Sequence, residues 1–353
     1  MVIAAISFVA VLVVLILVHE LGHFTTAKIF GVTVEEFGLG FPPRLLSFNK
    51  GNTKYSFNAI PLGGFVKLAG EENPNVAGSL AGKSILVRFL VLSAGSIMNL
   101  LLPLLLFSVA FIVPRDVLVG EVEILEVAPD SPAEISGMES GDIVLNINGT
   151  IINNTNDLSR HVQLNLGKEM SILVEHPDNT TEEFTVIPRW KPPQGEGATG
   201  IAVMTTNAEI IPKQSKPFWR AIPAGFTECI TTFILFKNEI ISVIIGNTTV
   251  SVAGPVGIAQ LTGEVVKAGL SPLLEFAAFL SINLGIINLF PLPALDGGRI
   301  TFVLLEWIRK GKRISPRKEG IIHAIGFALL MLAFLSITYQ DVARIINGES
   351  LLP

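Results

Sequence analysis

Cysteine and charged residues are scarce in this chain. Among its 353 residues there is one cysteine, Cys229, which excludes an intrachain disulfide framework and a cysteine-rich zinc site. Charged residues make up 16% of the chain, whereas an ordinary soluble domain averages about 25%. The net charge of −5 is small, so the sequence predicts no nucleic-acid partner.

The chain is instead rich in long apolar stretches. Half of the residues are hydrophobic and the mean hydropathy is +0.58, which is typical of a membrane protein. A transmembrane helix needs about 20 apolar residues, and such stretches occur at about 2–27, 85–113, 273–289 and 321–339. The first has neither a positively charged segment before it nor a small-residue cleavage site before its histidines. It is therefore predicted to be a retained transmembrane helix rather than a signal peptide.

The first apolar stretch carries His19, Glu20 and His23 near its end. Ionisable groups at membrane depth cost roughly 2.5–3.5 kcal/mol each, so their presence needs a reason. Positions i and i+4 share one face of a helix, so the two histidines can hold one Zn²⁺ while Glu20 faces a metal-bound water. The spacing predicts metal-assisted hydrolysis. A catalytic zinc needs a third protein ligand, which this motif does not supply.

The best candidate for that ligand is Asp296, which follows the third apolar stretch. Pro291 and Pro293 break the helix just before it, and Asp-Gly-Gly taken alone most often marks a turn or a helix cap. No other carboxylate lies in such an apolar, broken-helix setting, so we predict that Asp296 completes the site. His323 could also be imagined as a ligand, but the basic residues before it predict an interfacial position.

Residues 32–70 show a different pattern, with short pieces separated by glycine and proline. Polar and apolar residues alternate over 55–58, and a turn is expected at 49–52, which predicts a β-hairpin. An ordinary loop hairpin explains the pattern equally well. An extended edge beside a hydrolytic site could instead bind an unfolded polypeptide as an added strand.

Residues 114–190 are predicted to form a soluble domain of strands and turns. The order of Ser131-Pro132-Ala133, Gly141-Asp142 and the apolar strand at 143–148 resembles a bacterial PDZ domain, a module that binds extended peptides. His161 and His176 lie in this range and are expected to be surface or fold residues. Residues 191–270 are predicted to be a polar linker followed by amphipathic helices on the membrane surface.

Basic residues predict which side of the membrane each connection occupies. The connection before the fourth apolar stretch is rich in lysine and arginine, and so is the connection between the first two stretches. Positively charged loops stay in the cytoplasm. We therefore expect both connections there, with the PDZ-like domain outside the cell and with His23 and Asp296 near the cytoplasmic face of the cell membrane.

These motifs together resemble the site-2 protease family of intramembrane zinc metalloproteases, in particular the bacterial enzymes of regulated intramembrane proteolysis. The likeness rests on HELGH in the first stretch, FGLGFPP and IPLGGFVKLAGE after it, the PDZ-like insert, and NLFPLPALDGG after the third stretch. It covers nearly the whole chain. The second stretch departs from the family pattern, since Ser96 follows Gly95 where relatives commonly have proline, and Asn99 is expected to hold helices together.

The resemblance implies a polytopic α-helical membrane protein with about four transmembrane helices, a membrane-associated β-hairpin and one inserted α+β PDZ domain. The expected divisions are 1–113, 114–190, 191–270 and 271–353. It implies His19, His23 and Asp296 as Zn²⁺ ligands, Glu20 as general base, and Asn288 and Asn283 as substrate-binding residues. Expected partners are single-span membrane proteins such as anti-sigma factors or remnant signal peptides, a peptide or substrate ectodomain at the PDZ domain, and the lipid bilayer.

Two other functions fit parts of the same pattern. A catalytically inactive scaffold could use the PDZ-like module to collect peptides, and a metal transporter could use the histidines and Asp296 to move zinc. Neither needs a carboxylate placed to activate water, so Glu20 favours the protease.

Overall fold

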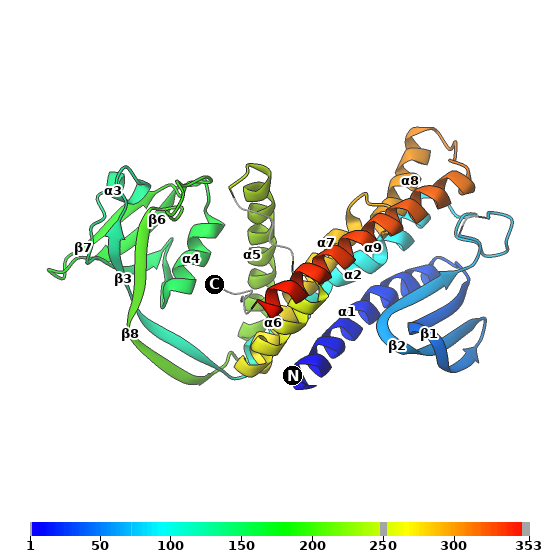
Figure 1. Ribbon diagram of the computed structural model, residues 1–353, viewed down its shortest axis with the longest axis horizontal. Coiled ribbons are helices and arrows are strands. Elements are labelled where there is room, and N and C mark those ends of the chain that lie inside the picture. The colour runs from blue at the N-terminus through cyan, green and yellow to red at the C-terminus, as the bar shows by residue number, and fades with distance from the viewer. Residues whose placement is uncertain (1, 72, 248–252, 348–353) are drawn as a thin grey trace. The chain divides into compact units, whose positions relative to one another are not determined.

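The computed structural model describes residues 2–71, 73–247 and 253–347. The chain divides into two compact units, shown in Figure 1. The first unit combines Met1–Ala110 with Val252–Pro353, and the second is Phe111–Ser251. The second unit is thus an insertion between two halves of the first.

The first unit contains the membrane helices. In the described part of the chain, four helices are long and apolar enough to cross a membrane, which confirms the prediction of a multi-pass membrane protein. They belong to α1 (Val2–Ile29), α2 (Ile85–Ile112), α7 (Leu270–Leu289) and α9 (Pro316–Ile346). The fourth is longer at both ends than the predicted 321–339. Pro103 lies inside α2 without ending it, as prolines do where neighbouring helices cover the backbone.

A long β-hairpin follows α1. Its strands are β1 (Val34–Lys50) and β2 (Thr53–Leu68), so the hairpin extends well beyond the short alternating pattern that predicted it. The ladder is irregular because residues 36–39 of β1 pair with 64–67 of β2 on one side and with 54–57 on the other. Asn58 donates to the Gly40 carbonyl at 2.9 Å within this folded-back region. Such irregularities bend a strand, which lets β2 curve back toward α1.

The base of the hairpin is tied to the end of α1. Lys28 in the last turn of α1 donates to the Thr53 hydroxyl at 2.7 Å, and that hydroxyl donates to the Val34 carbonyl at 2.9 Å. Gly31 turns the chain with a φ of +65°, which glycine adopts without a steric penalty. An apolar cluster around Ala27 and Val34 completes the junction. The hairpin is therefore held in place relative to the histidine-bearing end of α1.

Two further helices belong to this unit: α6 (Pro255–Ala268) and α8 (Asp296–Ile308). Helix α6 packs against α1, α7 and α9. Its first turn is anchored by the buried carboxylate of Asp341 in α9, which accepts from the Gly257 N–H at 2.7 Å. All of α6 falls in the 191–270 range, where we expected only a linker and membrane-surface helices. Its packing against three helices of the first unit is a correction to that expectation.

The second unit is an antiparallel sheet with helices beside it. The strand order is β7-β6-β4-β3-β8, and the short β5 pairs with β4. The elements are β3 (Arg115–Val127), α3 (Pro132–Ser136), β4 (Ile143–Ile147), β5 (Thr150–Ile151), α4 (Thr155–Leu164), β6 (Met170–Glu175), β7 (Thr181–Val186), β8 (Ile201–Gln214) and α5 (Phe218–Ile244).

Strand β8 is a second correction. It lies in the predicted linker, yet it pairs with β3 over nearly the whole length of both strands. The expected boundary at residue 190 therefore cuts off the edge strand of the sheet. The polar and glycine-rich residues at 188–197 form only the connection before that strand.

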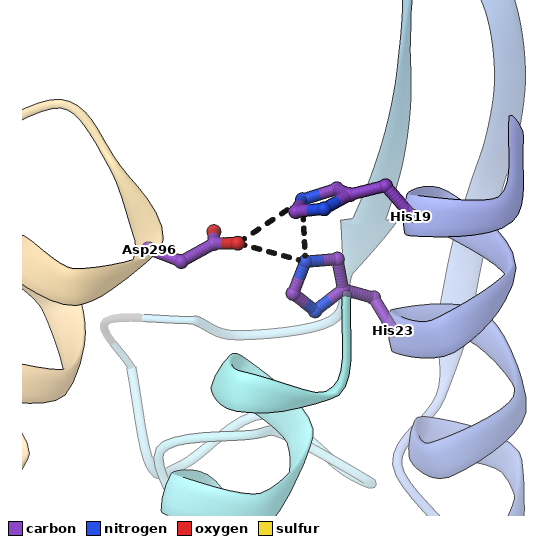
Figure 2. A group of neighbouring side chains, drawn as sticks. All are labelled: His19, His23 and Asp296. Atoms are coloured by element: carbon purple, nitrogen blue, oxygen red, sulfur yellow. Dashed lines mark hydrogen bonds and ion pairs between the residues drawn. The ribbon is translucent and has the colours of Figure 1, made fainter. Parts of the chain in front are cut away.

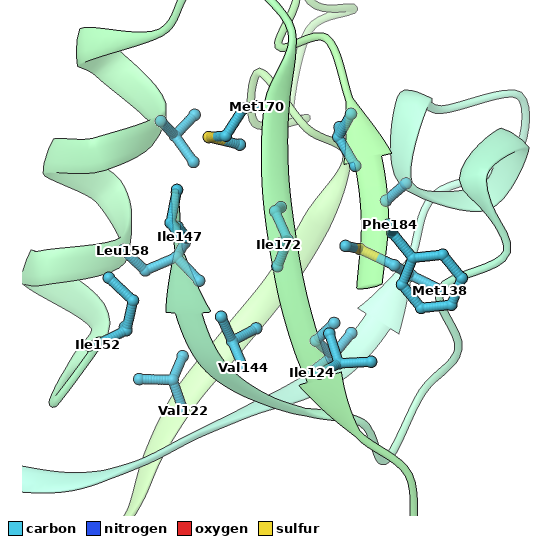
Figure 3. Packing of buried hydrophobic residues seen from close by; sticks show 14 residues of the cluster. Val122, Ile124, Met138, Val144, Ile147, Ile152, Leu158, Met170, Ile172 and Phe184 are labelled. Atoms are coloured by element: carbon cyan, nitrogen blue, oxygen red, sulfur yellow. The ribbon is translucent and has the colours of Figure 1, made fainter. Parts of the chain in front are cut away.

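The core of this unit follows from the period of two in its strands. Met170, Ile172 and Val174 alternate along β6 and are fully buried, and they pack with Val122 and Ile124 of β3 (Figure 3). Helices α3 and α4 begin at side-chain caps from Ser131 and Asn154, which accept from the backbone N–H three residues on. One of the amphipathic helices predicted within 191–270 is present as α5. It packs on α4, where Asn238 donates to the Gln163 carbonyl at 2.7 Å.

Candidate metal centre

His19 and His23 lie one turn apart on the same face of α1. Their Nε2 atoms are 3.2 Å apart, and Asp296 Oδ2 lies 3.1 Å from each of them (Figure 2). Both histidine side chains are nearly buried. The structure therefore brings together the three residues that the sequence predicted as ligands, although 273 positions separate His23 from Asp296.

A sharp turn places Asp296 opposite the histidines. Helix α7 ends at Leu289, the chain passes through two prolines, and Asp296 is the first residue of α8. A Cβ on Gly297 would lie 2.0 Å from the Phe290 carbonyl oxygen, and a Cβ on Gly298 would lie 2.5 Å from that of Leu292. Only glycine allows the turn to fold back this closely, which is why Asp-Gly-Gly occurs here. The partial positive charge of a helix N-terminus also favours a carboxylate at this position.

His323 supports this turn from α9. Its Nδ1 accepts a hydrogen bond from the Ala294 backbone N–H at 2.8 Å, two residues before Asp296. Ala294 has a φ of +75°, which is unfavourable for a residue with a side chain, so the turn needs such support. His323 lies outside the group formed by His19, His23 and Asp296. The basic residues before it gave no indication that it contacts the loop carrying Asp296.

Glu20 is held by the hairpin. The Val66 backbone N–H donates to its carboxylate, and a Cβ on Gly64 would lie 3.0 Å from its Cγ. Strand β2 therefore passes directly over this side chain. Glycine at position 64 permits that approach, so the hairpin orients Glu20 beside the histidines rather than serving only as a connection.

Helix α2 forms the opposite wall of the cluster. The Val91 carbonyl accepts from His23 Nδ1 at 2.8 Å. A Cβ on Gly95 would lie 2.3 Å from His23 Nε2 and 2.8 Å from His19 Cε1, so α2 can lie this close to α1 only with glycine there. The sequence drew attention to Gly95 as the residue before Ser96. The structure shows that it faces both imidazole rings of the cluster.

The chemistry of these atoms fits a metal ion. A carbonyl oxygen can only accept, so His23 Nδ1 must carry the proton and Nε2 of the neutral ring presents a lone pair. Two imidazole Nε2 atoms and a carboxylate oxygen then converge on one point. Ligand atoms that share a tetrahedral Zn²⁺ at about 2.0–2.1 Å are roughly 3.3–3.4 Å apart. The separations of 3.1, 3.1 and 3.2 Å match this arrangement.

The two predicted substrate residues, Asn283 and Asn288, lie in the second half of α7, before the turn that leads to Asp296. Asn283 donates to the Phe279 carbonyl of its own helix at 2.8 Å. Their role in substrate binding stays a prediction. His161 and His176 belong to the second unit, as expected of residues of its fold.

Comparison with known proteins gives a consistent result. The model of peptidase family M50 matches residues 7–333. The zinc metalloprotease RasP of Oceanobacillus iheyensis is 30% identical over 425 aligned positions, covering 96% of this chain and 99% of the relative. RasP of Geobacillus kaustophilus is 30% identical, covering 96% and 97%, and the regulator of sigma-W protease RasP of Bacillus subtilis is 27% identical, covering 96% and 98%. The chain thus belongs to peptidase family M50 and is a multi-pass membrane zinc metalloendopeptidase of the site-2 protease type.

Proposed function

We propose that this protein hydrolyses peptide bonds in or near the transmembrane segments of other membrane proteins, using a zinc ion held by His19, His23 and Asp296. The observation that carries the proposal is the convergence of the end of α1 and the start of α8 on one point. Helix α1 is itself long and apolar enough to cross a membrane and α8 follows such a helix, so the cluster belongs to the unit that contains the membrane helices.

Glu20 is the general base in this proposal. A Zn²⁺ ion held by His19, His23 and Asp296 would act as a Lewis acid, making a nearby water more acidic and polarising the substrate carbonyl. A carboxylate oxygen of Glu20 accepts the proton of the attacking water, and the same oxygen later donates it to the leaving amine nitrogen. The Val66 N–H keeps the carboxylate oriented through both transfers.

The substrate has to be extended at the point of cleavage. A helical segment shields its peptide bonds with its own hydrogen bonds, so it must unwind before water can attack. We propose that the extended segment is held near the base by the β1–β2 hairpin and by the amide side chains of Asn288 and Asn283. Segments containing glycine or proline, or already shortened by another protease, unwind most easily and are the expected substrates.

The second unit is proposed to be a PDZ domain that acts on the outer part of the substrate. The support is its strand and helix order, with a capped short helix after β3 and a second helix before β6. Strand β8 lies at one edge of the sheet, and a free edge can take up an extended peptide as an additional strand. Anti-sigma factors are proposed as substrates because one relative is named a regulator of sigma-W protease.

The proposal is tested by separating metal binding from cleavage. In Glu20→Gln the ligands are unchanged but the proton acceptor is lost. The purified variant should keep stoichiometric zinc and lose cleavage of a single-span reporter. In Asp296→Asn the carboxylate ligand is lost, so zinc content should fall together with cleavage.

Two results would contradict the proposal. Retained cleavage in Glu20→Gln would remove the assigned base. Unchanged zinc content in Asp296→Asn would show that a different residue completes the site. The wild-type reporter reaction, repeated after removal and return of zinc, provides the reference for both variants.

A further inference from the structure

Three residues of α2 line up beside the two histidines of α1. Val91, Gly95 and Asn99 are spaced four apart, so they follow one side of the helix. Val91 contacts His23 through its carbonyl, Gly95 leaves room for both imidazole rings, and Asn99 lies next to His19. Each histidine therefore has its own polar partner on α2, at the ring nitrogen away from the cluster.

The Asn99 side chain is fully buried, with no exposed surface. Its Nδ2 lies 3.4 Å from His19 Nδ1, while its Oδ1 has no hydrogen-bond partner among the described residues. The turn that carries it is held firmly, since Ser281 of α7 donates to the Asn99 backbone carbonyl at 2.7 Å. A buried amide oxygen without a partner is unfavourable because it has lost its hydrogen bonds to water, so this arrangement needs a physical reason.

The reason lies in which nitrogen of His19 carries the proton. His19 Nε2 faces Asp296 Oδ2 and His23 Nε2, which makes Nε2 the ligand atom. A neutral imidazole with a lone pair on Nε2 carries its proton on Nδ1. In the orientation described, that N–H meets the amide N–H₂ of Asn99, and two donors face each other.

Rotating the terminal amide by half a turn removes both conflicts. The amide oxygen and nitrogen have nearly the same shape, and which is which follows from the hydrogen-bond network. After the rotation Oδ1 accepts from His19 Nδ1–H, so the orphaned oxygen gains a partner and the facing donors disappear. The arrangement then parallels that of His23, whose Nδ1–H donates to the Val91 carbonyl.

We propose that Asn99 is a positioning residue for His19, with its amide oxygen fixing the tautomer and ring orientation that direct the Nε2 lone pair toward Asp296. This inference rests on the proposed role of His19 as a zinc ligand. It assigns Asn99 a task beyond the helix contact that the sequence suggested. Outer partners of this kind typically change metal affinity by about 10- to 100-fold when removed.

The test measures zinc affinity of the purified full chain by competition with a chelator. Asn99→Leu keeps the volume but has no acceptor, and its zinc Kd should rise by about 10- to 100-fold. Asn99→Asp keeps an acceptor and loses the donor, and its Kd should stay close to that of the wild type. The matched control is Ser108→Ala, which removes a hydroxyl from the same helix away from the cluster and should leave the Kd unchanged.

A second measurement reads the tautomer directly. In the zinc-loaded chain with ¹⁵N-labelled histidine, Nδ1 of His19 should carry a proton in the wild type, and its signal should shift in Asn99→Leu at saturating zinc. The inference is overturned if Asn99→Leu binds zinc like the wild type, if Asn99→Asp is as weak as Asn99→Leu, or if His19 Nδ1 is the metal-bound atom. A wild-type chain that holds no zinc would overturn the proposed function together with the role of Asn99. A wild-type chain that holds zinc, with any of the three results above, would overturn the role of Asn99 alone.

Discussion

At the scale of single residues, the cluster depends on nearby glycines as well as on its own polar side chains. Gly95 and Gly64 bring α2 and β2 to within contact of the histidines and Glu20. A methyl group at position 95 would meet both imidazole rings, and one at position 64 would meet the side chains of Glu20 and Ile16. Positions 95 and 64 therefore have little or no room for a side chain larger than that of glycine.

We predict that Gly95→Ala displaces the imidazole rings, because its Cβ would lie 2.3 Å from His23 Nε2. Zinc content after purification should fall, and cleavage of a transmembrane reporter should fall with it by at least about 10-fold. Gly320→Ala is the matched control. It also adds a methyl group to a helix, but nothing lies within 4 Å of the new Cβ. Equal zinc content in the two variants would contradict the close approach of α2.

His176 provides a prediction on pH dependence. A 2.7 Å hydrogen bond from its Nδ1 to the buried Asp142 carboxylate raises the pKa of His176 above its ordinary value of 6.5, against the smaller effect of desolvation. The protonated form thus stabilises the folded second unit. That contribution is complete below about pH 6.5 and is lost as the pH rises through the raised folded-state pKa.

The check is an NMR titration of His176 in the full chain, with unfolding followed over the same pH range. The midpoint should lie above 6.5, and in His176→Gln the corresponding decline in stability with rising pH should disappear. A midpoint at or below 6.5 would show that the Asp142 contact does not favour the protonated ring.

At the scale of elements, α8 is held at both ends. Its first residue is the proposed ligand Asp296, and near its other end Glu306 accepts two hydrogen bonds from Arg88 of α2, at 2.7 and 2.8 Å. Arg313 adds a third at 3.1 Å and also donates to the Ala81 carbonyl. Burial acts to raise the pKa of Glu306, but the two arginines outweigh it and lower the pKa, so the carboxylate is ionised.

We predict that Glu306→Ala destabilises the protein by about 3–5 kcal/mol, because it leaves the buried Arg88 without a counter-charge. Zinc retention should fall too, since α8 carries Asp296. The measurement is denaturant-induced unfolding in detergent micelles. Arg299→Ala serves as the control: it breaks the partly exposed Arg299–Glu71 pair and should cost only about 0–1 kcal/mol. Similar losses of stability in both variants would show that the buried Glu306–Arg88 pair stabilises the protein no more than the partly exposed pair does.

At the scale of the whole molecule, the proposed function requires that the two units face particular sides of the membrane. The connection between α8 and α9 is strongly basic and is expected in the cytoplasm, with the second unit outside. The chain is well suited to a labelling test, because its single native cysteine, Cys229, is buried and can be replaced by serine.

We predict that a membrane-impermeant maleimide labels Lys168→Cys in intact bacterial cells and labels Lys312→Cys only after permeabilisation. Both positions are exposed, so reagent access and not folding decides the result. Labelling of Lys312→Cys in intact cells would reverse the proposed orientation. The Cys229→Ser parent shows the background in both conditions.

The sequence by itself determined the features that depend on local pattern. Apolar length predicted the four spanning helices, helical spacing predicted that His19 and His23 share a face, and turn residues predicted a hairpin after the first helix. The position of Asp296 was predictable because a carboxylate in a broken apolar helix is costly unless it binds a cation or a donor. Strand β8 was missed because its alternation is short and follows a glycine-rich connection, so only its pairing with β3 identifies it.

Tertiary structure alone decided what surrounds the cluster. That Val66 reaches Glu20, that Asn99 lies beside His19 and that His323 supports the Ala294 turn are contacts between elements far apart in the chain. A hydrogen bond between distant segments leaves no period or spacing in the sequence. It follows only from how the helices and the hairpin pack, whereas a ligand pair on one helix is set by the 3.6-residue turn itself.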